Sequence, residues 1–92
     1  MKRYVIERNL PGVGSLSPAQ LKDAAATSNG ALAKLNGKVQ WEQSFVVADK
    51  TYCIYIAENE DAVREHASIS GFPANKITEV RKMIDPTTEK GD

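Results

Sequence analysis

The sequence has 92 residues, a length that allows one domain with one small core. Twelve Lys and Arg balance twelve Asp and Glu, so no bulk charge attracts nucleic acid or an anionic membrane. The apolar run Tyr4-Val5-Ile6 stops at Glu7, far short of a signal-peptide core, and no segment has the length of a transmembrane helix. We therefore expect a cytoplasmic protein without nucleic-acid or membrane partners, with a domain over residues 1–88 and a flexible tail over 89–92.

The first half of the chain predicts a strand followed by a helix. Residues 3–8 are rich in Tyr, Val and Ile, which favour a strand. Ser17-Pro18-Ala19-Gln20 is typical of a helix start, with Ser17 as the cap and Gln20 completing a capping box. One apolar stripe then follows helical spacing until Asn36-Gly37 ends the helix: Leu21, Ala25, Ser28, Leu32 and Leu35.

The next segments predict a hairpin and a second helix. Residues 39–48 alternate as a strand would, which places Val39, Trp41, Phe45 and Val47 on one face, and residues 52–57 form the next strand. Asn59 caps a helix that ends at Gly71, where Phe72 folds back as a hydrophobic plug. Helical geometry puts His66 on the inward face with Ala62, Val63, Ala67, Ile69 and Ser70.

The last element decides the fold class. Residues 76–85 fit a short helix or a strand by periodicity, and a strand completes the order β-α-β-β-α-β. We therefore predict an α+β, ferredoxin-like two-layer sandwich, an antiparallel four-stranded sheet with both helices on one face. The other face would be open, so it should pair with a second copy of the chain or hold a ligand.

Few side chains in the sequence offer chemistry. His66, the only histidine, is a candidate metal ligand or general base, or else a core histidine that hydrogen-bonds a backbone carbonyl or Ser70. Cys53 stands alone in an apolar strand, which indicates a buried and inert thiol. No triad or paired carboxylates accompany His66, so we assign no catalytic residue and expect no enzyme activity.

Four blocks of the sequence resemble a family of small bacterial ferredoxin-like proteins. The family was first catalogued as a domain of unknown function and is now often labelled nickel-binding protein. The blocks occur in order over nearly the whole chain: Tyr4 to Gly12, Lys50 to Ala57, Arg64 to Ala67, and Gly71 to Ile77. The resemblance implies the ferredoxin-like sandwich, a homodimer, and a strand for residues 76–85.

The resemblance also implies nickel, or another divalent transition metal, as the cofactor. Histidine-rich members are similar in carrying Asp-x-His on the first strand and His-x-x-x-His on the second helix. The matching positions here are Val5 and Glu7, then His66 and Ser70. This implies a metal site built from His66 and Glu7, completed by duplicate ligands across a dimer or by Glu42 or Asp85.

Two other hypotheses stay open at this point. One is a metal-free dimeric module that binds a partner or a small ligand on its open sheet face. The other is a cofactor-free enzyme of the dimeric ferredoxin-like type, with His66 as its base.

Overall fold

The computed structural model describes residues 1–91, and Asp92 lies outside the described residues. The elements in chain order are β1 (Lys2–Asn9), a short 3-10 turn (Val13–Ser15), α1 (Pro18–Lys34), β2 (Val39–Val46), β3 (Lys50–Ala57), α2 (Glu60–Ser70), β4 (Lys76–Glu79) and a 3-10 helix (Pro86–Lys90). Within this described part, no helix combines the length and the apolar character needed to cross a membrane.

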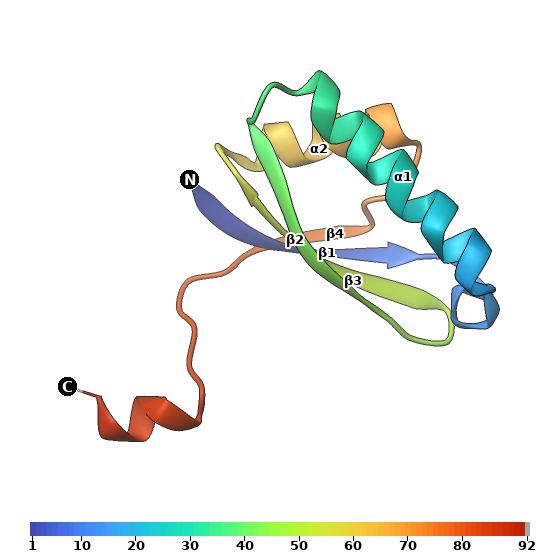
Figure 1. Cartoon of the computed structure of the whole chain (residues 1–92). Coiled ribbons are helices and arrows are strands. Elements are labelled where there is room, and N and C mark those ends of the chain that lie inside the picture. Colours follow the sequence, from blue (N-terminus) through green and yellow to red (C-terminus); the bar gives the residue numbers. More distant parts are fainter. Residues whose placement is uncertain (92) are drawn as a thin grey trace.

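The four strands form one antiparallel sheet in the order β2-β3-β1-β4. Both helices lie on the same face of this sheet, and the opposite face is not covered by either of them (Figure 1). This confirms the predicted ferredoxin-like α+β sandwich, including the final strand. The predicted capping box at the start of α1 is also present, because Ser17 and Gln20 exchange hydrogen bonds.

A bulge in β2 changes which side chains face the helices. The register against β3 shifts between Trp41 and Gln43, so the alternation restarts at that point. Trp41, Ser44 and Val46 therefore face the helix layer, whereas Phe45 lies on the open face, opposite Tyr52 in the register. The predicted common face for Trp41 and Phe45 was wrong, because simple alternation does not show an extra residue.

Strand β4 is shorter than predicted, ending at Glu79 rather than Asp85. Glu79 pairs with Tyr4, and the amide of Val80 donates to the Arg3 carbonyl at 2.8 Å, so the pairing ends before it reaches Lys2, the first residue of β1. The chain then leaves the sheet and ends in the separate 3-10 helix (Figure 1). That helix overlaps the predicted tail over 89–92, whose flexibility stays a prediction.

The hydrophobic core lies beneath α2 and the C-terminal half of α1. Its buried members from these helices are Leu35, just after α1, and Ala62 and Val63 of α2. The sheet contributes the remaining buried side chains: Tyr4, Ile6, Val39, Cys53, Tyr55 and Ala57. The N-terminal half of α1 adds none of these, so it is packed against the sheet differently from the rest of the helix.

The loop between β1 and α1 docks on the turn between β2 and β3. The amide of Leu10 donates to the Asp49 carbonyl at 3.0 Å, and the amide of Gly14 donates to the Ala48 carbonyl at 2.9 Å. A Cβ atom at Gly14 would lie 2.6 Å from the Val47 carbonyl oxygen, so this approach requires glycine. Leu10, Val13 and Leu16 of the docked loop lie at the space between the sheet and the first turns of α1.

Candidate functional site

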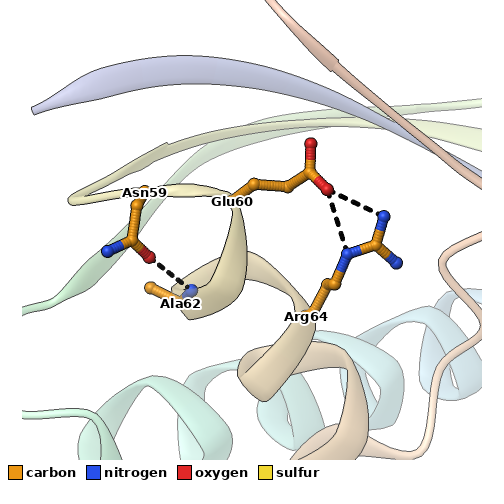
Figure 2. A network of polar contacts seen from close by, with 4 residues as sticks. All are labelled: Asn59, Glu60, Ala62 and Arg64. Atoms are coloured by element: carbon orange, nitrogen blue, oxygen red, sulfur yellow. Dashed lines mark hydrogen bonds and ion pairs between the residues drawn. The ribbon is translucent and has the colours of Figure 1, made fainter.

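Helix α2 is stabilised locally at its first turn, and its inward side buries His66. The side-chain oxygen of Asn59 accepts from the Ala62 amide at 2.9 Å, and the Arg64 guanidinium donates to Glu60 at 2.8 and 3.0 Å (Figure 2). The charged pair occupies the exposed side of the helix, and His66 on the inward side is fully buried. The inward position predicted for His66 is thus correct, whereas Ile69 is exposed.

The imidazole of His66 is hydrogen-bonded to α1. Its Nε2 lies 3.2 Å from the Ser28 carbonyl oxygen and 3.3 Å from Ser28 Oγ. A carbonyl oxygen only accepts, so Nε2 carries the hydrogen and Nδ1 the lone pair. Ser28 Oγ also lies 2.9 Å from the Tyr55 hydroxyl, whose ring packs against the imidazole at 4.8 Å between centroids. His66 therefore joins both helices to β3, as the predicted core histidine bonded to a backbone carbonyl would.

Glu7, the other candidate metal ligand, lies on the opposite face of the sheet. Tyr4, Ile6 and Arg8 are the buried side chains of β1, and Glu7 alternates with them. Its carboxylate is 3.9 Å from the Lys50 Nζ. One chain therefore does not bring Glu7 and His66 together.

The remaining candidate donors are already engaged elsewhere. Glu42 pairs with Arg3, whose hydrogen bond holds the pKa of that carboxyl below its usual range. Asp85 accepts from the Thr87 amide at 2.8 Å, and the Ser70 hydroxyl donates to the Ala67 carbonyl at 3.2 Å. Among the described residues, no three His, Cys, Asp or Glu side chains gather closely enough to hold a metal ion. The donor set of one chain does not fit a divalent transition metal, which prefers several nitrogen or oxygen ligands.

Arg8 is a buried cation that our sequence interpretation missed. It is 2 % exposed, its Nη1 donates to the Pro73 carbonyl at 2.8 Å, and its Nη2 has no hydrogen-bond partner. Its guanidinium carbon lies 5.8 Å from the Tyr55 ring centroid and 5.6 Å from that of Phe72. These rings stabilise the charge partly, but an unpaired buried ion still costs several kcal/mol. The sequence signal for this burial is that Arg8 alternates along β1 with the apolar residues Tyr4 and Ile6.

Arg8 lines a cavity of about 240 Å³ between the N-terminal half of α1 and the sheet. The wall is mostly apolar, and its aromatic members are Trp41, Tyr55 and Phe72. The other residues of the lining are Leu10, Val13, Leu16, Leu21, Ala24, Ala25, Ser28, Ser44, Val46, Thr51 and Cys53. Apart from Arg8, none of these lining side chains is charged.

Two polar residues of the cavity wall, Thr51 and Tyr55, neighbour Arg8. Thr51 lies opposite Arg8 in the register between β1 and β3, and Tyr55 packs beneath the guanidinium. Tyr55 is in turn hydrogen-bonded to Ser28, and burial raises the pKa of its hydroxyl, which therefore stays protonated. The cavity exists because Ala24 and Ala25 present only methyl groups toward the sheet. The arrangement suits the binding of a small molecule with a polar end and an apolar body.

The buried His66 predicts a pH-dependent stability. Burial lowers the pKa of His66, the positive charge of Arg8 lowers it further, and the hydrogen bond to Ser28 opposes this shift. Stability is therefore complete above the unfolded value of about 6.5 and falls as the pH drops below it, because only the unfolded chain then takes up the proton. We expect the free energy of unfolding to decrease from pH 7 to pH 5, with a slope of up to about 1.4 kcal/mol per pH unit.

Urea denaturation at several pH values measures this dependence. The variant His66→Gln, which keeps an N–H donor for Ser28, should show a flatter profile over the same range. Parallel profiles for the two proteins would contradict the assignment of this dependence to His66.

The comparisons with known proteins agree with this fold. The model of a family described as "Nickel responsive protein SCO4226-like" matches residues 4–80. The crystal structure of SCO4226 from Streptomyces coelicolor A3(2) is similar with a TM-score of 0.74 and 19% sequence identity, over 89% of this chain and 99% of that chain. No curated protein matches the sequence. Because the family match extends from β1 to the end of β4, this chain belongs to the SCO4226-like family of nickel responsive proteins.

Proposed function

We propose that this chain is a homodimeric binding protein that holds a small, mainly apolar molecule in the cavity beneath α1. The observation that carries the proposal is the cavity itself, about 240 Å³ with a mostly apolar wall and a few polar side chains. An engineered cavity of about 150 Å³ holds benzene, so this cavity has room for a substituted aromatic ring. We place this activity in the cytoplasm, a compartment that keeps a lone cysteine such as Cys53 reduced.

The surroundings of the cavity favour binding over catalysis. His66, the base of the rival enzyme hypothesis, is fully buried and is not among the lining residues. Its Nε2 hydrogen is directed to Ser28, so a molecule in the cavity would meet Ser28 rather than the imidazole.

Filling the cavity should abolish binding. In Ala25→Leu the added carbon atoms would occupy space beneath α1, so the affinity for toluene, phenylacetamide and phenylacetate should fall about tenfold or more. Amide chemical shifts and the fluorescence of Trp41, the only tryptophan, report occupancy because Trp41 lines the cavity. Ala33→Leu on the exposed side of the same helix is the matched control and should bind as the unchanged protein does. If none of the three probes shifts the resonances of the lining residues, the cavity is not a binding site.

The open sheet face supports the homodimer. Phe45 is 54% exposed there, next to Ile54 and Val80 in a shallow groove, and Met83 beyond β4 reaches the same groove. The same groove also contains Gln43 and the ion-paired Arg3 and Glu42, so a second copy would cover apolar side chains together with a charged pair. A two-fold axis would place the same residues on both sides of the contact.

Sedimentation analysis at micromolar concentration tests the dimer. The variant Phe45→Glu would bury a carboxylate in the contact, so the equilibrium should shift toward the monomer by a factor of ten or more, corresponding to at least about 1.4 kcal/mol. Ile69→Glu, an exposed position on the helix side of the molecule, should leave the equilibrium unchanged. A monomer at every concentration of the unchanged protein would be incompatible with the dimer.

Divalent metal binding is the second candidate, and membership of a nickel responsive family is the finding that supports it. Two ligands, His66 and Glu7, were predicted, and they lie on different faces of the sheet. A nickel ion held by Glu7 would therefore lie on the open face, where a dimer duplicates the carboxylate. His66 would take no part in such a site.

Calorimetric titration of tag-free protein with nickel separates these ligands. We expect His66→Gln to give the same heat as the unchanged protein, because the imidazole is sealed in the core. Any heat of nickel binding should fall in Glu7→Gln, which keeps the shape of the side chain and removes its charge. Loss of the heat in His66→Gln alone would instead establish the histidine as a ligand.

A further inference from the structure

We propose that the cavity selects an anionic ligand, a small apolar monocarboxylate whose carboxylate pairs with Arg8. This inference rests on the proposed function, because it names the class of molecule that the cavity beneath α1 would hold. The observation that carries it is the Nη2 of Arg8, a buried donor that has no partner and belongs to a residue lining the cavity.

Within residues 1–91, no side chain supplies a counter-charge for this guanidinium. Arginine does not lose its proton in a protein, so Arg8 keeps its charge while 2 % exposed. None of the ion pairs among the described residues includes Arg8, and no carboxylate lines the cavity. The neighbouring acid Glu7 alternates to the other face of the sheet. An anion in the cavity would provide both the missing charge and the missing acceptor.

The groups around Arg8 match a carboxylate rather than a more highly charged anion. Nη1 donates to the Pro73 carbonyl, whereas the buried Nη2 forms no hydrogen bond. The Thr51 hydroxyl lies across the strand pair and has only a weak thiol neighbour, Cys53 Sγ at 3.4 Å, so it remains able to donate. One cation and one hydroxyl satisfy a monoanion, whereas a phosphate dianion would need several more donors.

The rest of the cavity fits the apolar body of such an acid. From the guanidinium, the wall continues over the aromatic ring of Trp41 and the aliphatic side chains of Val13, Leu16 and Leu21. The Trp41 indole N–H donates to Ser44 at 2.9 Å and therefore needs no ligand atom. The apolar wall and the satisfied indole N–H both favour a ligand that is polar at one end only, with the size of phenylacetate.

The test compares a carboxylate with its neutral isostere in the unchanged protein. Phenylacetate should bind at least ten times more tightly than phenylacetamide, measured by titration of the amide chemical shifts of the lining residues. If the two bind equally, the charge selection is wrong while the cavity remains a binding site. If neither binds, the proposed function fails as well. Tighter binding of phenyl phosphate than of phenylacetate would overturn the assignment to a monocarboxylate.

Two variants locate the selecting charge. Arg8→Met fills similar space without a charge and should remove the preference for phenylacetate over phenylacetamide. Lys22→Met, which removes one positive charge from the exposed side of α1, should keep that preference. A preference that survives in Arg8→Met would exclude Arg8 as the carboxylate-binding residue. The comparison in the unchanged protein still decides the charge selection where the Arg8 variant does not fold.

Discussion

A single hydrogen-bonded junction at Ser28 sets the relation between the helices and the sheet. Its hydroxyl contacts Tyr55 of β3 and His66 of α2, and its backbone carbonyl accepts from the same imidazole. Because Ser28 lies near the middle of α1, the junction divides that helix into two parts. Near the C-terminal end of the helix, Leu32 and Leu35 pack in the hydrophobic core. Nearer its start, Ala24 and Ala25 line the cavity. The hydrophobic core and the cavity therefore lie on opposite sides of the Ser28 junction along α1.

The same junction explains where His66, the predicted metal ligand, lies in this chain. His66 occupies the position that resembles a ligand, but its geometry serves the contact between α1 and α2. The second helix position is Ser70, which donates to the Ala67 carbonyl of its own helix, just before the left-handed Gly71. A neutral, buried imidazole is compatible with stability near neutral pH, whereas a charged one is not. In this member the histidine therefore has a structural explanation that is independent of nickel.

The sequence could predict local structure well because most of its signals are local. Capping residues and glycine stops located both helices, and alternation located the strands of the hairpin. The errors arose where simple periodicity fails: the bulge in β2 reversed the face of Phe45, and β4 ended at Glu79, before the predicted Asp85. The cavity was not predictable in the same way, because a short apolar stripe on α1 shows which side faces the sheet and not how closely the two pack. The burial of Arg8 could have been predicted from the sequence, because Arg8 alternates along β1 with the buried residues Tyr4 and Ile6.

The burial of Arg8 is the feature of the structure that a contribution to folding stability explains least. A domain of this size has a free energy of unfolding of roughly 5–15 kcal/mol, and an unpaired buried cation costs a considerable part of it. The chain nevertheless builds a support for that cation, in which the Pro73 carbonyl holds one nitrogen and the rings of Tyr55 and Phe72 flank the charge. The turn after α2, which sequence patterns explain as a helix stop and a hydrophobic plug, is therefore also the support of the guanidinium. This support leaves the buried Nη2 without a partner in a residue that lines an apolar cavity, as expected for a site whose last component is a ligand.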